Sequence, residues 1–255
     1  MNVDYIKNGD CLELMKEIPD KSIDMILCDL PYGTTACKWD IIIPFEPLWE
    51  QYNRIIKENG VVLLFGSEPF STYLRMSNIK NYRYDWIWIK ERATGFNYAK
   101  YQPLRLNENI MCFYKNKPYY DSIGKKLEKP YKHCLPIYKS PSANMTSSGL
   151  DKDGNRIYKE YTHAHKNNIL YFNRVSNRKT IHPTQKPVEL LEYLIKTYTK
   201  ENEIILDNCM GGGSTCVAAI NTNRHYIGFE LDKNYFEIAD KRIKETIEEK
   251  EGKNE

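Results

Sequence analysis

The sequence predicts an α/β fold with a doubly wound, mostly parallel sheet of seven strands and one inserted region. Short apolar runs alternate along the chain with segments of helical periodicity, the order that builds such sheets. Several runs are apolar at almost every position, which is typical of parallel strands covered on both faces. The middle of the chain lacks this alternation and is rich in Pro, Ser, Asn and Lys, which indicates an insertion.

The seven runs have the length and the β-branched or aromatic content of strands. They span residues 5–7, 23–28, 61–65, 84–89, 109–114, 203–207 and 225–230. One helix is expected over 45–58, ended by Gly60, and a second begins at Pro187. A last helix buries an apolar face formed by Phe236, Ala239, Ile243 and Ile247. The predicted organisation is a sheet domain in two halves, 1–114 and 181–248, with an insertion at 115–180 and a disordered charged tail at 249–255.

Composition excludes several classes of protein. Charged residues make up 28% of the 255 positions and hydrophobic residues 41%, as in an ordinary globular protein. No apolar run approaches the ~18 residues of a membrane span, and we expect no signal peptide, because the first residues lack its apolar segment. The seven cysteines form no Cys-x-x-Cys pair, so we interpret them as free thiols of a cytoplasmic protein. No metal site is expected, because His163 and His165 are best interpreted as a surface pair.

The charge is concentrated in the insertion. Between residues 115 and 180 there are fourteen Lys or Arg against five Asp or Glu, a local net charge of +9, whereas the whole chain carries +3. The same stretch holds seven tyrosines. Basic residues interleaved with aromatic rings suit a polyanion with stackable bases, while the alternative is a solvated loop region.

The first motif that suggests chemistry is Asp29-Leu30-Pro31-Tyr32-Gly33, directly after a predicted strand. Ligands of open α/β sheets bind at the carboxyl ends of the strands. A carboxylate, a stiff turn with a free carbonyl and an aromatic ring suit a planar amine, because they accept its two N–H groups and stack on its face. The alternative is a proline-containing turn in which Asp29 caps the next segment.

The second motif runs from Asp207 to Thr215 and contains three consecutive glycines between a predicted strand and a helix. Glycines allow the backbone to approach a ligand closely, and the helix N-terminus favours negative charge. Glu230 follows Gly211 by 19 residues and closes the next strand, where an acidic residue is placed to accept ribose hydroxyls. The alternative is a tight turn beside a solvated Glu.

Together these motifs resemble the β group of the amino-methylating DNA methyltransferases that use S-adenosylmethionine. Residues 29–32 (DLPY) resemble the family's DPPY motif, residues 210–215 (MGGGST) its cofactor loop, and residues 182–187 (HPTQKP) the segment before that loop. The order of the motifs, with the variable region between them, is also that of the β group. The resemblance covers nearly the whole chain and implies a Rossmann-like fold, base flipping, and an insertion that serves as the target-recognition region.

The resemblance implies a role for each matching residue. Asp29 and a carbonyl of Leu30 or Pro31 would hold the amino group, and Tyr32 would stack on the base. The cofactor-binding set would be Asp10, Asp29, Thr184, Lys186, Asn208, Met210, Gly211, Gly213, Ser214, Thr215 and Glu230. DNA contacts would come from Arg156, Arg174, Arg178 and Lys179. From their position, residues 92–105 are expected to border the site.

Five positions depart from the family pattern: Leu30 replaces a proline, Asn208 and Cys209 stand where Pro and Phe are frequent, and Gly212 and Cys216 stand where Ser and Gly are expected. An initial Asp resembles the adenine-N6 group, since the cytosine-N4 group usually begins with Ser. Methylation of cytosine at carbon 5 would require a cysteine nucleophile, which in the enzymes of that type follows a proline. No Cys follows a Pro in this sequence, so this reaction is excluded. The alternatives are a cytosine-N4 enzyme, an RNA- or protein-modifying enzyme, and an inactive nucleic-acid-binding module. The family further implies a restriction-modification setting with a restriction endonuclease partner, a homodimer, and association with the nucleoid of a bacterium or phage-infected cell.

Overall fold

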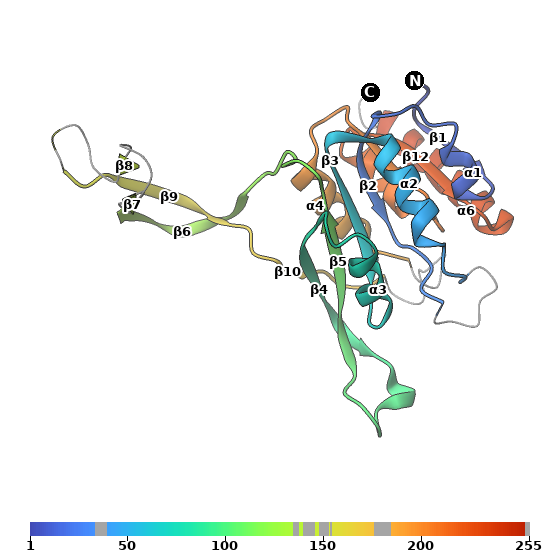
Figure 1. The fold of residues 1–255 in the computed structure, drawn as a ribbon, viewed down its shortest axis with the longest axis horizontal. Helices are drawn as coiled ribbons and strands as arrows, with labels where there is room; N and C mark the ends of the chain where they lie inside the picture. Colours follow the sequence, from blue (N-terminus) through green and yellow to red (C-terminus); the bar gives the residue numbers. More distant parts are fainter. Residues whose placement is uncertain are drawn as a thin grey trace. The chain divides into compact units, whose positions relative to one another are not determined.

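The computed structural model describes residues 1–33, 40–134, 138–139, 146–147, 153, 155–175 and 185–252. The chain divides into two compact units: unit 1 is Met1–Asp121 with Asn168–Glu255, and unit 2 is Ser122–Asn167. Figure 1 labels most of the helices and strands and colours the chain from the N-terminus to the C-terminus. None of the described helices is long and apolar enough to span a membrane.

Unit 1 is built on an eight-stranded sheet in the order β1-β12-β11-β2-β3-β5-β4-β10. Its strands are β1 (Tyr5–Asn8), β2 (Ile23–Cys28), β3 (Ile56–Gly66), β4 (Tyr82–Thr94), β5 (Arg105–Phe113), β10 (Ile169–Tyr171), β11 (Ile204–Asp207) and β12 (His225–Glu230). Within this sheet β5 alone runs against its neighbours. The mostly parallel α/β fold is therefore confirmed.

Helices cover both faces of the sheet (Figure 1). One face carries α1 (Cys11–Met15), α2 (Phe45–Ile55) and α3 (Phe70–Ser77). The other carries α4 (Val188–Tyr198), α5 (Ser214–Asn221) and α6 (Lys233–Glu251). Alternation along β2 divides its side chains between two cores, with Met25 and Leu27 in one and Ile26 and Cys28 in the other. This explains why the strand reads as continuously apolar.

Unit 2 contains two small antiparallel sheets. The first pairs β6 (Ile123–Cys134) with β9 (Tyr158–His165), and the second pairs β7 (Tyr138–Lys139) with β8 (Thr146–Ser147). Most described side chains of β9 are exposed, and Tyr131 stacks on Tyr161 with ring centroids 5.4 Å apart. Unit 2 is shorter than the insertion predicted at 115–180, because β10 and the residues on either side of it belong to unit 1.

The structure corrects three predictions about elements. Helix α2 ends at Ile55 and Gly60 lies within β3, where a Cβ would come within 2.9 Å of the Asp24 carbonyl oxygen, so close strand packing and not a helix end requires this glycine. The sheet also includes β10, which was not predicted because its three residues are too few to show a periodic pattern. Helix α6 continues into the predicted tail as far as Glu251, and Lys250 hydrogen-bonds there to the Ile220 carbonyl.

Candidate active site

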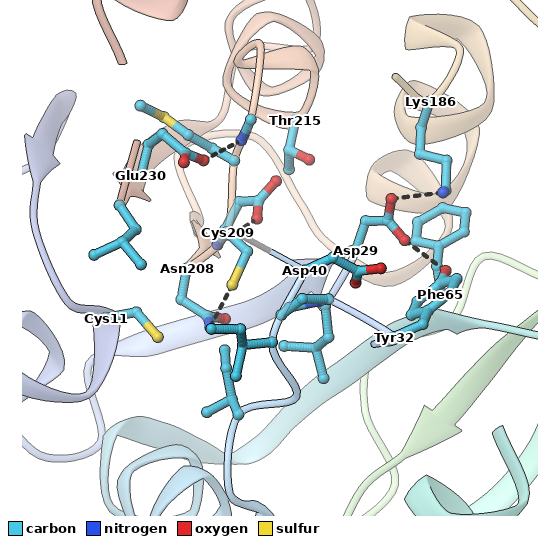
Figure 2. A pocket seen from close by; sticks show the side chains of 18 of the residues that line it. Cys11, Asp29, Tyr32, Asp40, Phe65, Lys186, Asn208, Cys209, Thr215 and Glu230 are labelled. Carbon is cyan, nitrogen blue, oxygen red and sulfur yellow. Dashed lines mark hydrogen bonds and ion pairs between the residues drawn. The ribbon is translucent and has the colours of Figure 1, made fainter. Parts of the chain in front are cut away.

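A cavity of about 420 Å³ lies in unit 1 at the edge of the sheet where the parallel strands end (Figure 2). The carboxyl ends of β1, β2, β3, β11 and β12 all meet there. Twelve of the predicted site residues line it: Asp10, Asp29, Leu30, Pro31, Tyr32, Lys186, Asn208, Met210, Gly211, Ser214, Thr215 and Glu230. The rule that ligands bind at strand ends therefore located the cavity from sequence.

Asp29 follows the buried strand β2 and sits at one side of the cavity. Its Oδ1 accepts a hydrogen bond from the Tyr32 hydroxyl at 2.6 Å, and its Oδ2 accepts one from Lys186 Nζ at 2.6 Å (Figure 2). The Tyr32 ring stacks on Phe70, with centroids 4.9 Å apart and an angle of 26° between the planes. Leu30 points into the core beneath the turn and is 3% exposed. The turn is thus anchored by one apolar side chain while its polar groups stay at the cavity.

Lys186 is the centre of a chain of alternating charges. Its Nζ lies 2.6 Å from Asp29 and 3.3 Å from Glu108 Oε2, and Glu108 also pairs with Lys90. All four side chains are less than 20% exposed. Burial opposes the charged form of Lys186, but the carboxylates of Asp29 and Glu108 outweigh it and raise the lysine's pKa. Lys186 is therefore a permanent cation beside the Asp29 carboxylate.

The carboxylates of this chain respond differently to the two lysines. Burial raises the pKa of Asp29, although the nearby Lys186 acts in the opposite direction. Burial also opposes ionisation of Glu108, but Lys186 and Lys90 together outweigh it and lower the pKa of Glu108. Glu108 is thus a firmly ionised bridge, while Asp29 is the more basic carboxylate at the cavity.

The loop after β11 forms the opposite wall. Asp207 Oδ1 accepts a hydrogen bond from the backbone N–H of Cys209 at 3.1 Å, and burial raises the pKa of Asp207 to about 6. Asn208 Oδ1 accepts a hydrogen bond from the Tyr52 hydroxyl at 2.6 Å, so this amide is held by α2. The position where the family often has Pro is therefore filled here by a hydrogen-bonded amide.

Glu230 closes β12 and is tied to the glycine loop. Its Oε2 accepts the backbone N–H of Gly211 at 2.8 Å (Figure 2), and its Oε1 accepts the backbone N–H of Asp232 at 2.8 Å. Each carboxylate oxygen keeps a second lone-pair direction for a ligand hydroxyl. Asp10 caps α1 by accepting the backbone N–H of Leu12 at 2.7 Å, which places it at the same end of the cavity.

Gly213 does not line the cavity. It caps α5 with φ of 73°, and a Cβ there would lie 3.2 Å from the Ala239 Cβ of α6. This glycine is required by the left-handed turn and by close helix packing. The fold thus explains this glycine, and its predicted contact with the cofactor stays a prediction.

Two thiols, Cys11 and Cys209, line the cavity, and Cys28 directly precedes Asp29. Cys209 Sγ accepts a hydrogen bond from the Asn208 side-chain amide at 3.5 Å. Burial raises the pKa of Cys28 to about 12, so this thiol stays protonated. The wall where the family often carries a phenylalanine is thus made of small, polarisable groups.

The predicted DNA contacts are spread over both units. Arg156 lies in unit 2, and Arg174 lies in unit 1, where its backbone N–H donates to Glu91 Oε2 at 2.7 Å. Thr184, Arg178 and Lys179 lie outside the described residues. No residue of unit 2 lines the cavity among those described.

Sequence reasoning missed several residues that the fold brings to the site. Phe65, next to the last residue of β3, and Asp207, the last residue of β11, both line the cavity. The second motif began at Asp207 without giving it a role, and the strand-end rule was sufficient to find both. Asp40 also lines the cavity and accepts the backbone N–H of Gly33 at 2.8 Å. Glu108 and Lys90 belong to no motif, and only the pairing of β4 with β5 brings them together.

The chain is similar in sequence and in fold to several known proteins. The family model described as DNA methylase matches residues 23–241. The type II methyltransferase M.HpaI of Haemophilus parainfluenzae is 26% identical over 248 residues, which cover 92% of this chain and 72% of that protein. The M1.HpyAVI–SAM complex aligns with a TM-score of 0.61 and 23% identity, covering 93% of this chain and 98% of that one. The PvuII DNA methyltransferase, described as cytosine-N4-specific, aligns with a TM-score of 0.65 and 14% identity over 94% of this chain and 86% of that one.

Proposed function

Since this chain belongs to the DNA methylase family, we propose that it transfers a methyl group from S-adenosylmethionine to the exocyclic N6 of an adenine turned out of DNA. The observation that carries this proposal is the pairing, in one cavity, of the Asp29–Tyr32 turn with the glycine loop and Glu230. The first group suits a planar amine, and the second suits a nucleoside. Asp29 as the first residue of the turn favours adenine over cytosine.

The donor set of the cavity fits S-adenosylmethionine. The Glu230 carboxylate has lone pairs free for two ribose hydroxyls, and Met210 with Leu231 offers apolar surface to a purine. Ser214 and Thr215 open α5, whose N-terminus favours the carboxylate of the methionine part. Bound there, S-adenosylmethionine supplies an electrophilic methyl group.

The residues of the turn would activate the amine. Asp29 accepts one N–H of the amino group and a carbonyl of Leu30 or Pro31 accepts the other, which directs the nitrogen lone pair at the methyl group. Lys186 keeps Asp29 ionised, and the raised pKa of Asp29 makes its carboxylate a strong acceptor for the proton that the nitrogen releases. Transfer is in line, with no covalent enzyme intermediate. Tyr32 stacks on the base and offsets part of the few kcal/mol that base flipping costs.

Basic residues of the predicted insertion would position the DNA. We assign phosphate or guanine contacts to Arg156 and Arg174, with Arg178 and Lys179 as further candidates. Replacing one phosphate-contacting arginine by alanine weakens binding to all DNA sequences alike, whereas replacing a base-reading arginine relaxes the recognition sequence. A methylation assay on a library of sequences distinguishes the two.

The partners of the protein are part of the same proposal. The relative M.HpaI is named a type II methyltransferase, so we propose a restriction endonuclease that recognises the same sequence and is blocked by the methylation. We also propose a homodimer, which sedimentation of the full chain tests directly.

The test is transfer of a labelled methyl group to mixed-sequence DNA, followed by digestion and mass spectrometry of the nucleosides. The wild type should produce N6-methyladenine, and Asp29→Asn should lose at least 100-fold in rate, roughly the scale of one lost acceptor in a preorganised site. N4-methylcytosine would overturn the target. Cofactor binding without transfer to any DNA would overturn DNA as the substrate, and DNA binding without cofactor binding would favour the inactive module.

A further inference from the structure

The hairpin formed by β4 and β5 extends beyond the rest of the sheet of unit 1 (Figure 1). Pairing of β5 with β3 stops at Asn109, and pairing of β4 with β10 stops at Ile89. Past these residues the two strands pair only with each other, at Asn107 and again at Arg105. We call residues 92–105 the hairpin tip; it contains the short 3-10 helix η1 (Phe96–Tyr98).

Three aromatic rings of the hairpin tip face solvent. Phe96 is 69% exposed, Tyr98 56% and Tyr101 85%. None belongs to either hydrophobic core, so the fold does not require them. Single exposed aromatic residues are normal on a protein surface, but several on one short segment leave a contiguous apolar surface in water. Such a surface marks an interaction site.

The charges of the hairpin tip select the kind of partner. Its ionisable side chains comprise the three cations Arg92, Lys100 and Arg105 and two tyrosines, with no Asp or Glu. Cations interleaved with flat rings fit a nucleic acid, whose phosphates and bases match both. A second copy of the chain is a poorer partner, because a two-fold contact between tips would place like charges together.

The hairpin starts beside the proposed catalytic turn. Glu108 on β5 pairs with Lys186, and Lys186 pairs with Asp29. Tyr101 is seven residues from Glu108 along the chain, so it can lie at most about 23 Å from it. At 3.4 Å per base pair this reach covers at most about seven base pairs of duplex.

We propose that the hairpin tip is a second DNA-binding surface that holds the duplex flanking the target base. Lys100, Arg92 and Arg105 contact phosphates, and the rings pack on sugars and bases in a groove. This inference rests on the proposed function, since it takes DNA as the substrate. It assigns part of the binding energy to unit 1 and not to the predicted recognition insertion.

The test compares two matched double variants of the full chain. Lys100→Ala/Tyr101→Ala removes a cation and a ring from the tip. Lys200→Ala/Ile79→Ala removes a cation and an exposed apolar side chain that precede β11 and β4, two strands whose amino ends lie at the edge of the sheet opposite the cavity. Binding is measured with a labelled 30-base-pair duplex of mixed sequence over a range of salt concentrations, and S-adenosylhomocysteine binding and thermal unfolding are measured in parallel.

The tip variant should bind DNA roughly tenfold or more weakly, since one stacked ring alone contributes about fivefold to a hundredfold. The slope of log affinity against log salt should decrease by about one for the lost phosphate contact. S-adenosylhomocysteine affinity and the unfolding temperature should not change, and the control pair should match the wild type in every assay.

Two results would overturn the inference while leaving the proposed function intact. In one, the tip variant binds DNA within twofold of the wild type. In the other, its affinity for DNA is retained and its molecular mass in solution falls, which would make the tip a contact between copies. A wild type that binds no DNA would instead overturn the proposed function and this inference together.

Discussion

Replacing Glu108 by Gln removes the central anion of the buried charge chain. This buried cluster of four linked side chains contains two cations, Lys90 and Lys186, and two anions, Glu108 and Asp29. The side chains of Lys90 and Lys186 are each 8% exposed and that of Glu108 is 16% exposed. Glutamine keeps the shape and one acceptor oxygen, so the change isolates the charge and leaves the cluster with an excess cation.

The expected loss of stability follows from this burial. Removing one partner of a buried ion pair costs about 3 to 5 kcal/mol, and the acceptor retained by Gln places the cost near the lower limit. In a domain of this size about 3 kcal/mol corresponds to a fall of roughly 6 to 12 °C in the unfolding temperature. Differential scanning calorimetry of the apoprotein measures it.

The loss should depend on pH in one direction. Because the two lysines lower the pKa of Glu108, the native carboxylate binds a proton less tightly than the unfolded one. Its stabilisation is therefore complete above the unfolded pKa and disappears as the pH falls through the lower native pKa. The wild type and Glu108→Gln should differ fully at pH 7 and converge below about pH 4.

A matched control exists on the surface. Glu58 also lies between two lysines, 3.0 Å from Lys21 and 3.2 Å from Lys115, but its side chain is 51% exposed. Glu58→Gln should leave the unfolding temperature unchanged, because solvent screens exposed pairs. Equal unfolding temperatures for the two variants would refute the idea that burial makes the Glu108 chain a structural element.

Three further predictions concern the cavity. Burial raises the pKa of Asp207 to about 6, so native Asp207 binds its proton more tightly than the unfolded residue. As the pH rises from 4 to 6, the free energy of unfolding should thus fall by about 1.4 kcal/mol per pH unit. Urea titrations should find no such slope in Asp207→Asn. Gly228→Ala places a Cβ 2.5 Å from Met210 Sδ and should weaken cofactor binding; an unchanged calorimetric Kd would contradict this. Tyr32→Phe keeps the ring but loses the hydrogen bond to Asp29, so its kcat should fall far less than that of Tyr32→Ala in steady-state assays.

The strand-end residues of the site were predictable because their signal is local. Asp29 and Glu230 each follow an apolar run directly, and the covered parallel sheet fixes where such residues must meet. Glu108 and Lys90 were not predictable, because each is an ordinary charge in sequence and only the register of two long strands pairs them. Gly60 was misassigned for a related reason: a glycine after a helical pattern looks like a helix end, whereas close contact with β2 requires it.

Activation of the N6 amine of an adenine in DNA by Asp29 is the step on which the proposed function depends. The most direct measurement is sequencing that detects modified bases in the genome of a methylation-free bacterial host expressing the chain. Wild-type protein should place N6-methyladenine at one short sequence, and the Asp29→Asn protein, expressed at the same level, should leave that sequence unmodified. N4-methylcytosine in the wild type, or N6-methyladenine that persists in Asp29→Asn, would contradict the claim.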